Sequence, residues 1–219
     1  EIFRLKGEFL HRLGDGEQAH NFYLASLQLN RNLEKGWPSW GTFCDHRYVE
    51  SNDPVFLEYA VSCYLQGIKY GNASGRSKIA RVLSLLSFDN VNGMVGKAVD
   101  KHADGLPLWV WLAWVPQLLV SLQRPEAVHA KNILMKISKV YPQALYYSLR
   151  TFLLERRDAG AQRAAGKDGK DTNPDYDASV TPAVAFDSAK EVMELLRRDH
   201  ANLASELELL LTEVGSSRF

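Results

Sequence analysis

The chain has 219 residues, enough for one or two ordinary domains with a sizeable buried core. Its 26 lysine and arginine residues balance 26 aspartate and glutamate residues, so no overall field draws DNA or an anionic membrane surface to the protein. Nucleic acid and membranes are therefore not expected partners. No charged segment followed by an apolar run and a small-residue cleavage site signals secretion, so we expect an intracellular protein.

The first part of the chain contains a repeat of helical pairs. A shift of thirty-four residues, the period of the tetratricopeptide repeat, superposes Phe3 on Trp37, Gly7 on Gly41 and Ser26 on Ala60. Small residues in this repeat let the two helices of a pair approach closely. Helical spacing already begins at Ile2 and the first residue is not methionine, so we expect this chain to be part of a longer one.

Helical periodicity continues along the rest of the chain, and no stretch sustains the alternation of a β-strand. Apolar stripes with helical spacing occupy residues 56–67, 79–86 and 133–141, separated by turn signals rich in glycine, proline, asparagine and aspartate. Since each stripe needs a neighbour to cover it, antiparallel helix pairs stacked in series are the simplest arrangement. The sequence predicts an all-α fold, an α-solenoid of tetratricopeptide-like or HEAT-like helix pairs.

Residues 106–119 are apolar on every side, yet they are too few to cross a bilayer, which takes ~20 residues. We expect a buried helix with a kink or a break at Pro116, because the proline ring crowds the carbonyl four residues earlier. Trp109, Trp111 and Trp114 are candidates for an aromatic recognition surface, since tryptophan is enriched in binding hot spots. The interleaved leucine and valine residues favour core packing instead.

The composition changes over residues 156–184, where alanine, glycine, aspartate, lysine, threonine and asparagine dominate. We expect a flexible insertion, because such a tract buries too little to offset ~1 to 2 kcal/mol of backbone ordering per residue. A surface tether and a segment that orders on binding are both compatible with this composition. The predicted organisation is a helical solenoid over 1–155, the insertion over 156–184, and a further helical pair of the same solenoid over 185–219.

No catalytic, cofactor-binding or metal-binding residue is predicted. Cys44-Asp45-His46 places a nucleophile, an acid and a base side by side, but adjacent helical residues point in different directions. The segment 71–77 resembles a phosphate-binding loop but has arginine in place of lysine and one residue too few between its glycines. The histidines and cysteines show no zinc-site spacing. We expect Cys44 and Cys63 to be reduced thiols in the core.

Two blocks of sequence carry a resemblance to a known family. They are Trp111-Leu112-Ala113-Trp114-Val115-Pro116-Gln117-Leu118-Leu119, and Tyr141-Pro142-Gln143-Ala144 continuing to Leu149-Arg150-Thr151. Both resemble the FAT region of the phosphatidylinositol-3-kinase-related kinases. Within that family the second tryptophan and the Leu-Arg-Thr ending look most like the TRRAP-like pseudokinases. Ser148 departs from the proline often found in the family, and the glycine-rich loop, Asp-Phe-Gly and His-Arg-Asp motifs of an active kinase do not occur.

The resemblance implies a non-catalytic scaffold in SAGA-type histone acetyltransferase coactivator complexes of the nucleus. Its implied partners are other subunits of the complex, the kinase-like domain of the same chain, and transcription activators. It implies no cofactor and no small-molecule substrate, and it identifies no partner-binding residue. The alternative is the regulatory FAT solenoid of an active kinase of the same family, and a third possibility is an unrelated tetratricopeptide protein.

Overall fold

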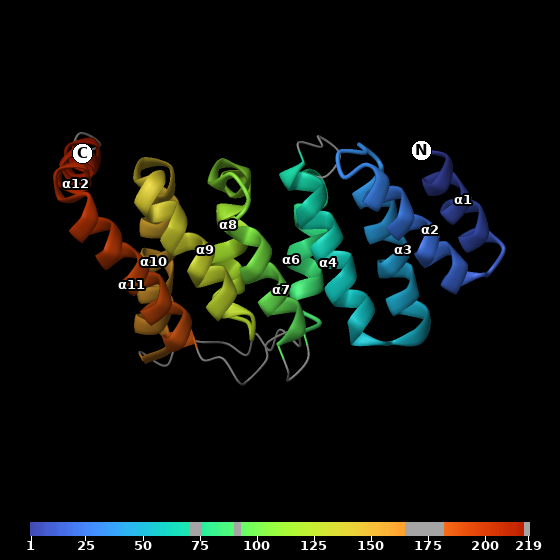
Figure 1. The fold of residues 1–219 in the computed structure, drawn as a ribbon. Coiled ribbons are helices and arrows are strands. Elements are labelled where there is room, and N and C mark those ends of the chain that lie inside the picture. Colours follow the sequence, from blue (N-terminus) through green and yellow to red (C-terminus); the bar gives the residue numbers. More distant parts are fainter. Residues whose placement is uncertain (71–75, 90–92, 165–181, 217–219) are drawn as a thin grey trace. The chain divides into compact units, whose positions relative to one another are not determined.

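The computed structural model describes residues 1–70, 76–89, 93–164 and 182–216, and within these ranges it contains helices and no strands (Figure 1). The helices group into two compact units, Glu1–Pro107 and Leu108–Phe219. This confirms the all-α prediction. The boundary after Pro107 was not predicted, because it falls inside an apolar run that the sequence presents as one helix. No helix of the described ranges is both long and apolar enough to cross a membrane.

The first unit is a series of packed helix pairs. Its helices are α1 (Ile2–Arg12), α2 (Gly16–Leu29), α3 (Gly36–Ser51), α4 (Pro54–Lys69), α6 (Ile79–Leu86) and α7 (Met94–Ala103). Helix α1 packs on α2, α2 on α3, α3 on α4, and α4 on both α6 and α7. Aspartate side chains cap two of the starts, since Asp15 accepts from the backbone N–H of Gln18 and Asp53 from that of Val55. Neighbours in sequence are thus neighbours in space, as a solenoid requires.

Small residues bring the two helices of the first two pairs together, as predicted. A Cβ added to Gly7 of α1 would lie 3.3 Å from the Tyr23 ring of α2. A Cβ added to Gly41 of α3 would lie 2.7 Å from the Tyr64 ring of α4. The glycine in each first helix therefore makes room for a tyrosine ring in the second helix, and the shift of thirty-four residues is correct for the first helices.

The predicted match of Ser26 with Ala60 is wrong. The second helices repeat after forty-one residues, because Tyr64 takes the place of Tyr23, and at this shift Ala60 matches Ala19. Both alanines are completely buried. The seven additional residues reflect longer helices: α3 has 16 residues where α1 has 11. Helix α4 has 16 residues where α2 has 14, so the two helices of the second pair are together seven residues longer than those of the first.

A buried carboxylate joins three helices of the first unit. Asp45 of α3 is 8% exposed and accepts two hydrogen bonds from the guanidinium of Arg81 in α6, at 2.8 and 2.7 Å. It also accepts one from the hydroxyl of Tyr64 in α4, at 3.3 Å. Bidentate charge-assisted pairs of this kind are strong and directional. The ion pair of Asp45 with Arg81 therefore holds α6, the first helix of the third pair, against α3 of the second pair.

The second unit is also built from packed helices. Its helices are the 3-10 helix η1 (Leu108–Trp114), α8 (Val115–Ser121), α9 (Ala127–Val140), α10 (Pro142–Ala164), α11 (Pro182–Asp199) and α12 (Ala201–Ser216). Helix α9 packs on η1, α8, α10 and α11, and α11 packs on α10 and α12. Glu208 of α12 accepts hydrogen bonds from the Tyr146 hydroxyl and the Arg150 guanidinium of α10. Stacked helix pairs in both units confirm the predicted solenoid architecture.

The tryptophan-rich segment is broken next to Pro116, as predicted. The 3-10 helix ends at Trp114 and α8 begins one residue later, so Pro116 lies in the first turn of α8. A proline at this position sacrifices no hydrogen bond, because the first amides of a helix have no partner within it.

The three tryptophans do not share one environment. Trp111 is completely buried, Trp114 is half-buried and Trp109 is 47% exposed. A 3-10 helix has three residues per turn, which places Trp111 and Trp114 on one face and Trp109 on another. Core packing is therefore confirmed for Trp111 and wrong for Trp109.

The predicted insertion over 156–184 is shorter in the structure. Helix α10 continues to Ala164, and α11 already begins at Pro182. Residues 165–181 lie outside the described residues. The sequence after Arg156 is poor in apolar side chains but rich in alanine and arginine, which are strong helix formers and extend an existing helix.

We expect Gly41→Ala to destabilise the protein. Alanine favours a helix interior by ~1 kcal/mol over glycine, but the new methyl group would lie 2.7 Å from the Tyr64 ring and 3.2 Å from the Cβ of Cys63. Overpacking costs about 1 to 3 kcal/mol, so urea unfolding should show a net loss of about 1 kcal/mol. The control is Gly105→Ala, whose Cβ would meet its nearest atom at 3.4 Å. Equal stability of both variants would contradict tight packing at Gly41.

Trp111→Ala and Trp109→Ala form a matched pair within η1. Removing the buried indole of Trp111 should cost about 3 to 5 kcal/mol, as for other large core side chains. Replacing the exposed Trp109 should lower the stability much less. Thermal unfolding of both variants measures the contrast. Similar melting temperatures would show that the two side chains contribute alike and would contradict their assigned environments.

Candidate partner-binding groove

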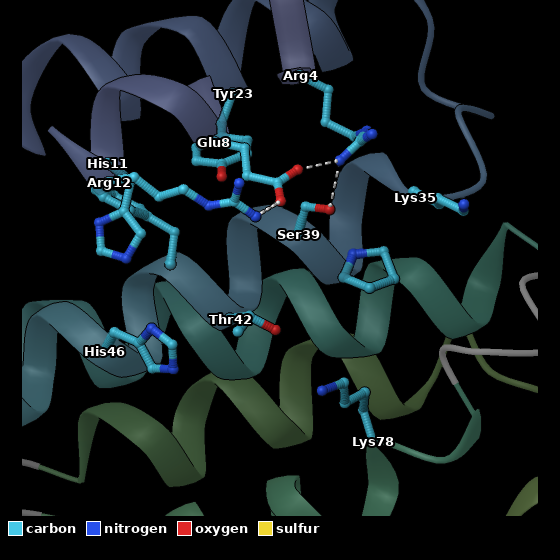
Figure 2. A pocket seen from close by; sticks show the side chains of 12 residues that line it. Arg4, Glu8, His11, Arg12, Tyr23, Lys35, Ser39, Thr42, His46 and Lys78 are labelled. Carbon is cyan, nitrogen blue, oxygen red and sulfur yellow. Dashed lines mark hydrogen bonds and ion pairs between the residues drawn. The ribbon is translucent and has the colours of Figure 1, made fainter. Parts of the chain in front are cut away.

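A groove on the first unit collects basic side chains from successive helix pairs (Figure 2). Its volume is about 680 Å³, and most of its lining comes from α1 and α3, the first helices of the first two pairs. Tyr23 of α2 and Lys78, immediately before α6, complete it. Solenoid proteins commonly bind partners on the surface formed by such successive helices.

Helical spacing explains why these side chains meet. Helix α1 contributes Arg4, Glu8, His11 and Arg12, which lie three and four residues apart on one face. The start of α3 and its following turns contribute a second row with the same kind of spacing, namely Lys35, Pro38, Ser39, Thr42, Phe43 and His46. The groove is therefore built from residues that are distant in sequence.

A carboxylate inside the groove bridges two arginines. Glu8 accepts hydrogen bonds from Arg4 at 3.0 Å and from Arg12 at 2.8 Å (Figure 2). Arg4 is only 7% exposed; it also donates to Glu1 at 2.7 Å and to the Ser39 hydroxyl at 3.4 Å. The hydrogen bond to Glu1 is the largest cause that raises the pKa of Arg4. Arg4 is thus a fixed, permanently charged part of the wall.

The groove has more positive than negative charge. Arg4, Arg12, Lys35 and Lys78 line it, and Glu8 is the carboxylate among the lining residues. Lys35 and Lys78 form no ion pair with any described residue, although the Lys78 ammonium lies 5.4 Å from the centre of the Tyr64 ring. A chain with zero net charge therefore concentrates positive charge at one place.

Aromatic and imidazole rings form the inner surface of the groove. Tyr23 and Phe43 are each 2% exposed, and the His11 ring meets the Phe43 ring edge-on at 5.0 Å. Burial, and next the charge of His46, lower the pKa of His11, which favours the uncharged form of its ring. The arrangement combines a basic rim with an apolar floor, which suits a partner carrying both carboxylates and apolar groups.

The structure separates the three residues of Cys44-Asp45-His46. Asp45 is held by Arg81, His46 faces the groove, and Cys44 is buried beside Cys63. Both cysteines are free and buried, which confirms the prediction of reduced core thiols. A hydrogen bond from Cys63 lowers the pKa of Cys44, whereas burial raises that of Cys63. The imidazole that contacts Cys44 is His20 of α2, which also helps to lower the pKa of Cys44, and not the adjacent His46.

Two other candidate sites, a metal site and a phosphate-binding loop, were considered from the sequence. No group of three or more metal-ligating side chains occurs in the described ranges. The loop that resembles a phosphate-binding sequence falls largely on residues 71–75, outside the described residues. The groove itself was not predicted. Its only sequence signal was the recurrence of basic residues on the first helices, which composition does not reveal.

Glu126, immediately before α9, is a buried carboxylate without a hydrogen-bond partner among the described residues. It is 5% exposed, and both carboxylate oxygens lack a partner there. Burial is the largest influence on its pKa, which is raised. Raised carboxyl pKa values often mark catalytic acids, but Glu126 does not belong to the groove and no cluster of metal-ligating groups surrounds it. A buried carboxylate without a partner is costly, so we expect Glu126 to lower the stability of the fold.

Residues 1–84 match the family model of the FAT domain. The chain is 36% identical over 98% of its length to the SAGA complex/NuA4 acetyltransferase complex subunit TRA1 of Saccharomyces cerevisiae, of which it covers 6%. It is 32% identical over 98% of its length to the transformation/transcription domain-associated protein of Homo sapiens, of which it covers 5%. The chain thus corresponds to a small part of these relatives.

A more distant match is the DNA-dependent protein kinase catalytic subunit of Xenopus laevis. The identity is 24% over 53% of the chain, and the chain covers 3% of that protein. Both the identity and the matched share are lower than for the transcription-associated proteins. The sequence similarity therefore favours these proteins over the kinase.

Glu126→Gln should give a pH-dependent gain in stability. Because the pKa of Glu126 is raised on folding, its stabilising contribution is complete below the unfolded pKa and is lost as pH rises through the folded pKa. The variant should exceed the unchanged chain by about 1 kcal/mol at pH 7, and the difference should shrink near pH 4. Urea unfolding at both pH values tests this, with exposed Glu206→Gln as the control. A pH-independent difference would contradict the assignment.

Proposed function

Because this chain belongs to the FAT-domain family of TRA1 and the transformation/transcription domain-associated protein (TRRAP), we propose that it is a segment of a non-catalytic scaffold subunit. The complex that this subunit serves is a SAGA-type or NuA4-type histone acetyltransferase coactivator. The proposal concerns the parent protein, since the chain covers only 6% of the yeast relative.

The observation that carries the proposal is similarity along nearly the whole chain to subunits of acetyltransferase complexes. It extends over 98% of the residues in the yeast and human relatives. The structure supports a scaffold role as well, because each unit is a stack of helix pairs whose polar clusters, such as Asp45 with Arg81, hold helices together. The partly buried pair of Asp45 and Arg81 joins α3 to α6 by two hydrogen bonds.

The partners that we propose are other subunits of the complex and the kinase-like domain of the same parent chain. Transcription activators are a further class of partner, and the nucleus is the compartment in which these proteins would meet. We propose that the kinase-like domain of the parent is inactive. An active kinase remains the alternative, but the lower identity and shorter match to a protein kinase disfavour it.

Affinity purification of the full-length protein tests the proposal. We expect acetyltransferase-complex subunits among the co-purifying proteins identified by mass spectrometry, and no ATP turnover. The core variant Trp111→Ala should reduce their recovery if this segment is an integral part of the scaffold, whereas Trp109→Ala should have a smaller effect.

One result of this purification would contradict the scaffold proposal. Phosphotransfer activity that follows the purified protein through successive columns, without acetyltransferase subunits, would favour the active kinase and overturn the scaffold proposal.

A further inference from the structure

We propose that the basic groove of the first unit binds an acidic peptide segment of a protein partner. Glutamate or aspartate carboxylates of the peptide would pair with Lys35 and Lys78, and an apolar side chain between them would rest on the half-buried Pro38. The inference rests on the proposed function, since a scaffold segment must offer surfaces to other proteins. It adds a location and a chemical class of ligand to that function.

The groove already binds a carboxylate of its own. Glu8 is held between the guanidinium groups of Arg4 and Arg12, and its two oxygens accept separate hydrogen bonds at 3.0 and 2.8 Å (Figure 2). Charge-assisted hydrogen bonds from arginine to carboxylate are short and geometrically selective. Arg4 is nearly buried while Arg12, which is paired with Glu8, is largely exposed, so the Arg12 guanidinium also presents a surface to an incoming acidic side chain. The groove thus already contains the type of arginine–carboxylate hydrogen bond that we propose for the peptide.

Two further cations are available to a ligand. Lys35 is exposed, Lys78 is half-buried, and neither forms an ion pair with the residues that the structure describes. They come from the start of α3 and from the residue before α6, so they belong to different helix pairs. A ligand that reaches both must span part of the groove. An extended peptide does so, because successive side chains on one face of a strand lie roughly 7 Å apart.

The surface of the groove favours a peptide over other anions. Its volume of about 680 Å³ and its apolar floor exceed what a single phosphate needs. A nucleic acid would require a basic surface that continues beyond the groove, whereas the chain as a whole carries equal numbers of acidic and basic residues. Carboxylates beside apolar side chains match both parts of the lining.

Fluorescence anisotropy on the full 219-residue chain tests the proposal. The probe is a fluorescein-labelled peptide of glutamates interrupted by leucines, and the reference is the same peptide with every glutamate replaced by glutamine. We expect binding of the glutamate peptide to weaken with salt, as screening predicts, and the glutamine peptide to bind far less. The double variant Lys35→Glu with Lys78→Glu should bind the glutamate peptide about tenfold more weakly.

The matched control is Lys97→Glu with Lys101→Glu, two exposed lysines of α7 outside the groove. It makes the same change in net charge and should leave affinity nearly unchanged. Circular dichroism and thermal unfolding of both double variants show whether they are folded. If the groove variant unfolds, the charge-neutralising pair Lys35→Gln with Lys78→Gln replaces it, with an expected loss of about threefold.

Several outcomes would overturn the groove assignment. Equal binding of the glutamine peptide, or equal losses in groove and control variants, would show that the groove does not select carboxylates. Competition by inorganic phosphate at low concentration would identify a small-anion site, and tighter binding of a single-stranded oligonucleotide would identify a nucleic-acid surface. If acetyltransferase subunits co-purify but the peptide does not bind, only this inference fails; if the peptide binds but no subunit co-purifies, the proposed function fails.

Discussion

The close approach of paired helices at a glycine and a tyrosine is the constraint on which the first unit depends. At Gly7 and at Gly41 the absence of a side chain lets a tyrosine ring of the partner helix pack against the backbone. This contact fixes how the two helices face one another in the pairs α1/α2 and α3/α4. Because the same contact recurs, successive pairs present equivalent faces, and their first helices can build one continuous surface.

The groove is a consequence of that recurrence. Tyr23 packs against Gly7 on one side and lines the groove on the other, so the residue that sets the helix spacing also forms the floor. Tyr64 plays a related part in the next pair, since its ring meets Gly41, its hydroxyl binds Asp45, and the Lys78 ammonium lies over its face. Tyr23 and Tyr64 thus set the spacing of the paired helices and also contact residues of the groove or of the Asp45 cluster.

Local patterns predicted the features that depend on near neighbours in sequence. The helical class, the break beside Pro116 and the buried thiols all follow from periodicity, proline geometry and composition. Features that depend on three-dimensional registration were missed. The exposure of Trp109 depends on a 3-10 turn that apolar periodicity cannot reveal, and the second helices of the repeat were aligned seven residues out of place. The basic groove could not be seen in the sequence because its charged residues come from separate helices. Acidic residues elsewhere in the chain offset them, so the net charge is zero.

The difference in length between the first two helix pairs has an implication for how such arrays change over time. The helices of the second pair are together seven residues longer than those of the first, five residues in the first helix and two in the second. The added length lies between the glycine–tyrosine contact and the connection that joins the two helices, so the glycine and the tyrosine still meet. The connected end of a pair can therefore lengthen, even unequally in its two helices, without disturbing this contact. Length differences among such pairs should collect at that end.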